Sequence, residues 1–239
     1  MTNSPVVSEQ DDSPTGTART SALPAVRAPQ GHGLPGLLVV FEGGEGVGKS
    51  TQIARLIAHL ERTRPSRQVL QSREPGGTPA AEALRRIALD PEFEGLAARA
   101  EALVFAAARS DHAHRVIRPA LAAGALVVLD RYIDSSVVYQ GMARGLGAAD
   151  VEALSMWATE GLAPDLVFVL DLDPSIGLAR VARPDRMESA GLEFHHRVRE
   201  GFLERAASDP GRYRVIDASA GIGEVAEQIA AHMDAVLDG

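Results

Sequence analysis

The sequence predicts an α/β fold: a parallel sheet of five strands with helices on both of its faces. Short apolar runs alternate with longer helical patterns, which is the rhythm of strands joined by crossover helices. The length of 239 residues suits one globular unit, and 45% hydrophobic with 23% charged residues is an ordinary balance for a globular protein. The predicted strands are Leu37 to Phe41, Val69 to Gln71, Leu126 to Leu129, Leu166 to Leu170 and Tyr213 to Ile216.

Helical periodicity fills the stretches between these runs. Ile53, Leu56, Ile57 and Leu60 are spaced i, i+3, i+4 and i+7, which gives one apolar helix face, and Pro65 ends that helix. A second long helical region covers about residues 96 to 123, where Pro119 is expected to bend it. The last helix is predicted over about residues 223 to 237.

The first 35 residues differ in composition from the rest. They contain five prolines and hardly any periodic apolar pattern, so we expect a disordered tail over 1–35 and one domain over 36–239. Acidic Glu9, Asp11 and Asp12 and the lack of an apolar central region argue against a secretory or transit peptide, and we expect a cytoplasmic protein.

Composition excludes several classes of function. The chain has no cysteine, which rules out disulfides, thiolate metal sites and cysteine nucleophiles, and no apolar stretch is long enough for a membrane span. The 24 basic and 32 acidic residues give a net charge of −8, so no global basic field is available to hold a nucleic acid. Any phosphate must therefore be bound locally.

A local phosphate site is predicted between the first strand and the first helix. Residues 43–50, GGEGVGKS, fit the pattern G-x-x-x-x-G-K-[ST], whose backbone N–H groups cradle phosphates. Lys49 is expected to reach the β and γ phosphates of a nucleoside triphosphate, and the Ser50 hydroxyl to ligate Mg²⁺. The residues expected to bind ATP are Gly43, Gly44, Glu45, Gly46, Val47, Gly48, Lys49, Ser50 and Thr51.

Two common classes of P-loop protein do not match. The only asparagine is Asn3 and the only lysine is Lys49, so the Asn-Lys-x-Asp segment with which GTPases read guanine is missing. The Ser-Gly-Gly-Gln signature of transport ATPases is missing too.

Three further motifs follow the P-loop in order. They are Arg73-Glu74-Pro75-Gly76-Gly77-Thr78, Phe105-Ala106-Ala107-Ala108-Arg109, and Asp130-Arg131-Tyr132 running on to Tyr139-Gln140-Gly141. Together with residues 41–52 they resemble the bacterial thymidylate kinases, and the similarity covers about residues 37 to 237. The resemblance implies the three-layer P-loop kinase fold and a homodimer. The lid expected here is short, because the chain has only Arg183-Pro184-Asp185-Arg186 where the bacterial family usually carries a longer insert rich in glycine and arginine.

The three further motifs predict a second ligand site next to the P-loop, and part of it follows from spacing alone. Phe105 and Arg109 are four residues apart on one helix face, so an aromatic plane and a guanidinium fork can act on one ligand; a core aromatic beside a surface charge is the alternative. Arg73 and Arg131 each follow a strand, at the edge where open sheets bind ligands. Asp130 ends an apolar strand, where a carboxylate would hold Mg²⁺, with Asp171 and Asp173 as competitors.

The resemblance implies roles for these residues. Arg73 and Arg131 would clamp the phosphate of dTMP, and Phe105 and Arg109 would contact its base. Ser135 and Tyr139 would approach thymine and sugar, with Gln140 in the same site. A lid over residues 180–189 would supply Arg186 to the γ-phosphate, because the P-loop centre has no basic residue. The expected catalytic residues are thus Lys49, Asp130, Arg131 and Arg186.

The implied reaction transfers the γ-phosphoryl group of ATP to dTMP, giving ADP and dTDP for dTTP biosynthesis. Two alternatives remain open from the sequence. A kinase of another pyrimidine nucleoside monophosphate shares everything except the base contacts. A non-kinase P-loop ATPase of the partition type usually has an additional lysine near the start of its P-loop, which this chain lacks.

Overall fold

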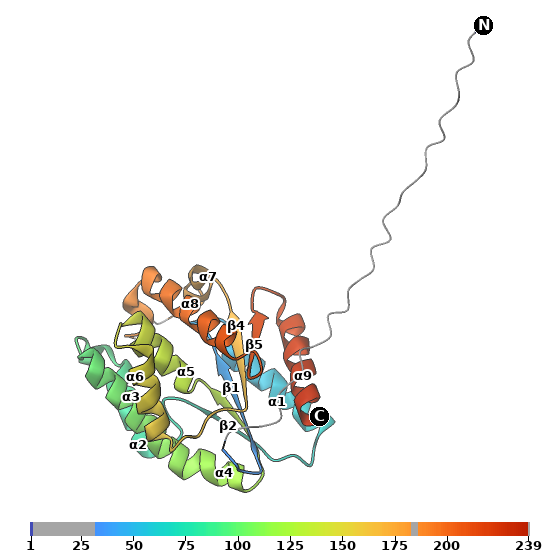
Figure 1. Cartoon of the computed structure of the whole chain (residues 1–239), viewed down its shortest axis with the longest axis horizontal. Helices are drawn as coiled ribbons and strands as arrows, with labels where there is room; N and C mark the ends of the chain where they lie inside the picture. Colours follow the sequence, from blue (N-terminus) through green and yellow to red (C-terminus); the bar gives the residue numbers. More distant parts are fainter. Residues whose placement is uncertain (2–31, 183–185, 239) are drawn as a thin grey trace.

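The computed structural model describes residues 1, 32–182 and 186–238. Its five strands are all parallel and lie in the order β2-β3-β1-β4-β5, which confirms the predicted α/β fold (Figure 1). The strands are β1 (Leu37–Glu42), β2 (Val69–Arg73), β3 (Leu126–Asp130), β4 (Leu166–Asp171) and β5 (Tyr213–Asp217).

Helices cover both faces of the sheet. The α-helices are α1 (Lys49–Thr63), α2 (Pro79–Leu89), α3 (Ala98–His112), α4 (Arg118–Ala122), α5 (Ile133–Ser136), α6 (Ala148–Ala158), α7 (Pro174–Leu178), α8 (Leu192–Ser208) and α9 (Ile222–Asp238). Shorter turns are 3-10 helices η1 (Pro91–Phe93) and η4 (Glu188–Ala190) and π-helical segments η2 (Ala113–Ile117) and η3 (Val137–Ala143). None of the described helices is both long and apolar enough to cross a membrane.

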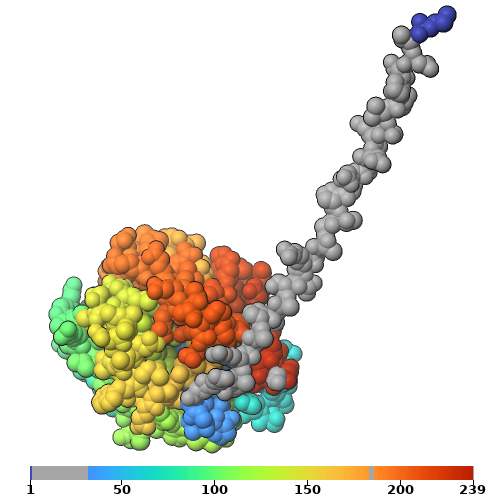
Figure 2. All heavy atoms as spheres, in the orientation of Figure 1, coloured from blue at the N-terminus to red at the C-terminus, as the bar shows by residue number. Residues whose placement is uncertain are grey.

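The core has two layers because side chains alternate along each strand. Leu38 and Val40 of β1 point into a cluster with Phe202 of α8, whereas Val39 and Phe41 point into a second cluster with α1 and α9. Both faces of β1 are buried, as expected for a central strand of a parallel sheet. In the space-filling view, α8 and the neighbouring η3–α6 region cover the sheet from this side (Figure 2).

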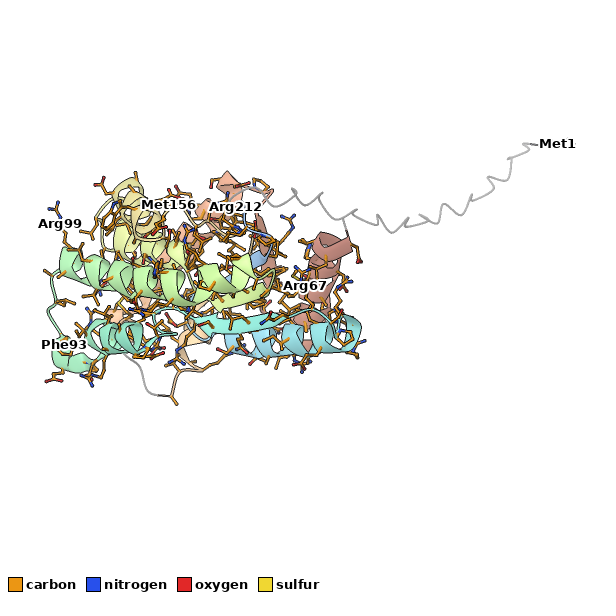
Figure 3. The ribbon with its side chains drawn as sticks, turned by 90° about the horizontal axis from the view of Figure 1, so that it is seen from below. Met1, Arg67, Phe93, Arg99, Met156 and Arg212 are labelled. Carbon is orange, nitrogen blue, oxygen red and sulfur yellow. The ribbon has the colours of Figure 1, made fainter. Side chains whose placement is uncertain are left out.

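The predicted helix over residues 96 to 123 is one nearly continuous run, from α3 through η2 to α4, with Arg99 labelled near its start (Figure 3). Pro119 sits in the first turn of α4, directly after the π-helical segment Ala113–Ile117. Proline has no N–H to donate to the preceding turn, and the wider π-helical turn accommodates that loss within the helix.

Residues 2–31 of the expected tail lie outside the described residues. The next few residues contact the domain: His32 Nε2 lies 2.9 Å from Asp165 Oδ2, and the Gly36 N–H donates to the carbonyl of Leu121. Asp165 Oδ2 also accepts the N–H of Leu38 at 2.8 Å, which ties this segment to the start of β1. Within the described residues, the chain thus contacts the domain from His32 onward.

Candidate active site

The P-loop connects β1 to α1, as the sequence predicts. Its backbone adopts conformations that favour glycine: φ is 130° at Gly43, 64° at Gly46 and 97° at Gly48. A Cβ atom at Gly46 would also collide with the carbonyl oxygen of Gly177. The loop therefore requires its glycines both for its curvature and for its packing, and it ends at the N-terminus of α1, which favours an anion.

Lys49 lies inside this loop. Its Nζ donates to the carbonyl oxygens of Gly44 at 2.8 Å and Gly43 at 3.3 Å, and the residue is 8% exposed. Burial lowers the pKa of Lys49 from 10.5 to about 8, helped by the Arg131 charge and opposed by nearby carboxylates. At neutral pH the ammonium group is thus still charged, at the position where the P-loop holds phosphate.

Ser50 and Asp130 provide two oxygen ligands next to the P-loop. Ser50 Oγ donates to Asp130 Oδ2 at 3.0 Å, because the end of β3 lies beside the end of β1 in the sheet. Among the described residues no group of three His, Asp or Glu side chains gathers as a metal site. This sparse set of hard oxygens fits Mg²⁺, which keeps several water ligands and takes others from substrate phosphates.

Two pockets adjoin at this edge of the sheet. The first, of about 680 Å³, extends from the P-loop, Arg73 and Arg180 to an apolar end at Ala220, Ile222 and Val225. The second, of about 150 Å³, contains six of the seven residues predicted for the acceptor: Phe105, Arg109, Arg131, Ser135, Tyr139 and Gln140. Glu45, Glu74, Arg85 and Arg131 border both pockets, so a ligand in one meets a ligand in the other at these side chains.

Arg131 occupies the junction. It adopts the left-handed conformation, with φ of 70°, which directs its side chain back across the P-loop. Its guanidinium donates to Gly43 O at 3.0 Å, Ser135 Oγ at 3.1 Å and Glu45 Oε1 at 2.8 Å. Tyr139 donates its hydroxyl to the same Glu45 oxygen at 2.7 Å. A cation and a phenol from the motif of residues 130–141 therefore meet a carboxylate of the P-loop between the pockets.

Glu45 is ionised in this setting. Burial alone would raise the pKa of its carboxyl, but the charges of Arg131 and Lys49 outweigh burial and lower the pKa to about 2. Glu45 thus contributes stability that is fully present above the ordinary pKa of 4.5 and is lost as the pH falls toward 2.

The sequence prediction missed Glu42, the last residue of β1. Its carboxylate accepts the backbone N–H groups of Tyr132 at 2.8 Å and Ser135 at 3.2 Å, and the Ser135 hydroxyl at 2.6 Å. These bonds hold the loop that carries Arg131. Burial, and then the neighbouring Asp134 charge, raise the pKa of Glu42 to about 7. A carboxyl directly before a glycine-rich loop is the signal that could have revealed it.

This shifted pKa predicts a pH-dependent stability that Glu42→Gln removes. Between pH 4.5 and 7 the folded protein binds a proton at Glu42 that the unfolded chain releases, so this stability is complete below 4.5 and lost as the pH rises through 7. The free energy of unfolding can be measured in urea at pH 5 and at pH 8. We expect it to change between these two pH values by about 2 kcal/mol less in Glu42→Gln than in the wild type. Equal changes in both proteins would contradict the assignment.

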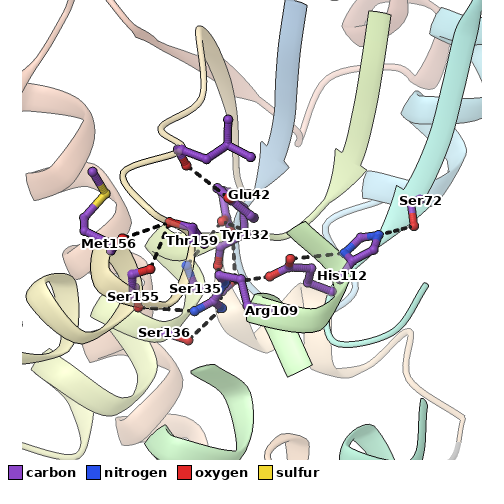
Figure 4. A network of polar contacts seen from close by, with 12 residues as sticks. Glu42, Ser72, Arg109, His112, Tyr132, Ser135, Ser136, Ser155, Met156 and Thr159 are labelled. Carbon is purple, nitrogen blue, oxygen red and sulfur yellow. Dashed lines mark hydrogen bonds and ion pairs between the residues drawn. The ribbon is translucent and has the colours of Figure 1, made fainter. Parts of the chain in front are cut away.

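Arg109 is not a surface charge. It is 3% exposed, and it donates to Glu74 Oε2 at 2.6 Å, Ser136 Oγ at 2.9 Å, the Tyr132 carbonyl at 3.1 Å and Ser155 Oγ at 3.2 Å (Figure 4). These bonds fix the guanidinium at the wall of the second pocket. The alternative of a solvated arginine, which spacing alone left open, does not hold.

Glu74 in turn is held by His112, a second residue that the sequence prediction missed. His112 is fully buried, with Nδ1 3.1 Å from Glu74 Oε1 and Nε2 2.8 Å from Ser72 Oγ (Figure 4). Because the Glu74 carboxylate accepts at one end of the ring, the proton is assigned to Nδ1. The chain of contacts links β2 to the base of the second pocket.

Three other predicted residues, Arg73, Asp171 and Asp173, have different surroundings. Arg73 borders the first pocket and forms an exposed pair with Glu82 at 3.0 Å. Asp171 is paired with Arg199 at 2.6 Å, and Asp173 caps α7 through the Ser175 N–H at 2.9 Å, so neither Asp171 nor Asp173 competes with Asp130.

Arg186 is not brought to the P-loop. It forms a buried ion pair with Glu101 at 2.6 Å and donates to the carbonyl of Ala88 at 3.0 Å. From the same lid segment, Arg180 lines the first pocket and donates to the carbonyl of Gly46 at 3.1 Å. Residues 183–185 of the expected lid, Arg183 included, lie outside the described residues.

A P-loop pocket that shares an arginine with a smaller pocket has the parts that a nucleoside monophosphate kinase needs to bring two nucleotides together. Residues 41–229 match the family model of thymidylate kinase, and the chain belongs to the thymidylate kinase family. This confirms the resemblance seen in the motifs.

Curated relatives and a solved structure agree with this assignment. The chain is 47% identical over 208 residues to a thymidylate kinase of Bifidobacterium longum subsp. infantis, covering 85% of this chain and 88% of the relative. It is 48% identical over 204 residues to that of Leifsonia xyli, covering 84% and 95%. A crystal structure of thymidylate kinase from Ehrlichia chaffeensis superimposes with a TM-score of 0.69 at 30% identity, covering 83% and 98%.

Proposed function

We propose that this enzyme transfers the γ-phosphoryl group of ATP to dTMP, giving ADP and dTDP, with ATP in the first pocket and dTMP in the second. The observation that carries the proposal is the junction at Arg131, which borders both pockets and lies next to the P-loop. Because the acceptor phosphate and the γ-phosphate must meet in line, a cation common to both pockets is the group the reaction needs.

The chain's own residues position and neutralise the two anions. A phosphomonoester has its second pKa near 6, so dTMP is already a dianion at neutral pH and needs no general base. Lys49 would exchange its bonds to the P-loop carbonyls for phosphate oxygens, and Arg131 would exchange Glu45 for the acceptor phosphate. Mg²⁺, held by Ser50 and Asp130, would neutralise charge on the ATP phosphates.

A panel of monophosphates with ATP tests this function. We expect dTMP to be phosphorylated with the highest kcat/KM, and dCMP and AMP to be poor acceptors. Preference for another pyrimidine nucleotide would point to the sister kinases, and ATP hydrolysis without transfer to any monophosphate would favour a non-kinase ATPase. The second pocket, with a buried arginine and an aromatic side chain, speaks against the non-kinase ATPase.

We propose Arg180, and not Arg186, as the lid arginine at the γ-phosphate. Arg180 already contacts the P-loop carbonyl of Gly46, whereas Arg186 is held by Glu101. Arg180→Ala should lower kcat by about 100-fold with little change in the KM for dTMP. Arg186→Ala is the matched comparison from the same segment, and a larger loss of kcat for Arg186→Ala would reverse the assignment.

We also propose a homodimer formed through α3 and α6. Trp157 is 81% exposed and Leu103 57% exposed, and both line an apolar groove of about 610 Å³ together with Leu154 and the small side chains of Ala106 and Ala107. A second hollow, of about 230 Å³, continues this surface past Leu103 and Leu154. An exposed apolar face of this kind suits a second copy of the chain.

Trp157→Glu should convert the dimer to a monomer, because it places a charge in the centre of this face. Sedimentation should then give the mass of one 25.2 kDa chain instead of two. Val215→Glu, at a half-exposed apolar residue of the edge strand β5, is the control and should leave the mass unchanged. A wild-type monomer would contradict the proposal.

A cytoplasmic location without nucleic-acid partners fits the ATP substrate and the net charge of −8.

A further inference from the structure

Glu101, in the first turn of α3, is a fully buried carboxylate behind the wall of the second pocket. Its Oε1 accepts the amide N–H of Gln140 at 2.9 Å and the Nε–H of Arg144 at 2.9 Å. Its Oε2 lies 2.6 Å from Nη1 of Arg186. Glu101 itself does not border the pocket, whereas Gln140 does. Its contacts thus reach the pocket through the side chain of Gln140.

These contacts fix which end of the Gln140 amide faces the pocket. A carboxylate paired with two guanidinium groups has no proton to give, so only the NH₂ end of the amide can face Glu101. The amide oxygen is then at the opposite end. Among the described residues, no group donates a hydrogen bond to Gln140 Oε1. This oxygen is also not fully enclosed by the protein. The pocket therefore receives a hydrogen-bond acceptor at this position.

We infer that Glu101 is a positioning residue that makes the acceptor pocket select a base edge carrying an N–H donor. Thymine and uracil present N3–H on their pairing edge, whereas cytosine presents an unprotonated nitrogen at the same place. An amide oxygen held toward the pocket accepts a hydrogen bond from the N3–H of thymine or uracil, whereas it repels the lone pair on the unprotonated nitrogen of cytosine. The inference deepens the proposed function and rests on it, because it assumes that dTMP binds in the second pocket.

Arg144 and Arg186 pair with Glu101 and hold its carboxylate in place, and this gives Arg186 a role different from a phosphate contact. The ion pair connects α3 to the chain just before η4, and Met187 and Glu188 of that segment line the second pocket. A neutral side chain at position 101 could turn its amide either way, and the amide of Gln140 would then be free to turn with it. The fixed negative charge is what removes this freedom.

The test compares dTMP, dUMP and dCMP as acceptors for the wild type, Glu101→Gln and Glu101→Asp. Glu101→Asp keeps the charge for the arginines but withdraws the carboxylate from Gln140. Both variants should lower the preference for dTMP over dCMP, measured as the ratio of kcat/KM values, by about tenfold or more. The preference for dTMP over dUMP should stay unchanged, since both bases carry N3–H. General damage to the pocket would move both ratios together.

Gln140→Met completes a double-mutant cycle. It removes the amide but leaves Glu101 paired with Arg144, and it should lower the dTMP to dCMP preference as the Glu101 variants do. Adding Glu101→Asp to Gln140→Met should then change that preference no further. Two results would overturn the inference. One is a dTMP to dCMP preference that is unchanged in the Glu101 variants. The other is a preference that Glu101→Asp lowers as much in the Gln140→Met protein as in the wild type. If neither Glu101 variant folds, the Gln140→Met ratios decide: an unchanged preference overturns it and a selective loss supports it.

These outcomes are separate from the failure of the proposed function. A wild-type protein that phosphorylates none of the three monophosphates would contradict the function itself. A wild-type dTMP kinase whose variants keep the dTMP to dCMP preference would contradict only the role of Glu101.

Discussion

Replacing Lys49 with methionine should lower kcat by about 1,000-fold or more without destabilising the fold. Lys49 is the only lysine of the chain, and its ammonium group is the one side-chain cation of the P-loop itself. Its charge is costly to bury, since burial lowers its pKa to about 8. An apolar side chain of similar length relieves that cost, so the unfolding midpoint of Lys49→Met at pH 7 should be no lower than that of the wild type.

Lys49→Arg is the informative companion to this variant. It keeps a positive charge but introduces a planar fork into a loop where Nζ lies within 3.3 Å of two carbonyl oxygens. We expect Lys49→Arg to lose most of the activity as well, because a guanidinium group cannot occupy the place of a compact ammonium group. Steady-state kinetics with ATP and dTMP measure both variants, and turnover within tenfold of the wild type for Lys49→Met would remove Lys49 from the mechanism.

The second large effect is expected at Arg131. Arg131→Ala should lower kcat/KM for dTMP by about 1,000-fold, because its guanidinium borders both pockets and is the group we propose to serve both phosphates. Arg131→Lys should recover only a small part, since a single ammonium group cannot contact Gly43, Ser135 and the acceptor phosphate together.

The left-handed backbone at Arg131 allows activity to be separated from stability. With φ of 70°, alanine is strained at this position and glycine is not. Arg131→Gly should therefore be as inactive as Arg131→Ala but more stable, by about 1 kcal/mol in urea unfolding. If either variant were as active as the wild type, the role of the Arg131 side chain would be contradicted. If Arg131→Ala and Arg131→Gly were equally stable, the backbone strain of alanine at this position would be contradicted.

Local patterns were sufficient for the framework of the fold and for most of the candidate site. The apolar runs located the strands because a central parallel strand is buried on both faces, and the P-loop motif located its own strand and helix. Phe105 and Arg109 could be paired because four residues is one turn of a helix. Each of these inferences uses residues that are close in the sequence, where spacing alone determines geometry.

The assignments that the sequence alone does not supply depend on contacts between distant segments. Arg180 and Arg186 both fall in the expected lid segment, and their contacts with Gly46 and with Glu101 distinguish them. Glu42 and Glu101 likewise acquire their roles from partners on other elements, which no periodic pattern indicates. A buried carboxylate is visible in a sequence as a residue type, but its partners come from the fold.

The two halves of the site are built from different kinds of structure. Register in the sheet sets Phe41 of β1 and Arg73 of β2 opposite Asp130 of β3, so the phosphate-handling edge is fixed by backbone pairing. The wall that we propose to read the base comes from helical segments, α3 and η3, outside the sheet. Evolution or engineering can therefore retune which nucleobase is accepted by exchanging side chains on those helices, while the transfer chemistry is inherited intact.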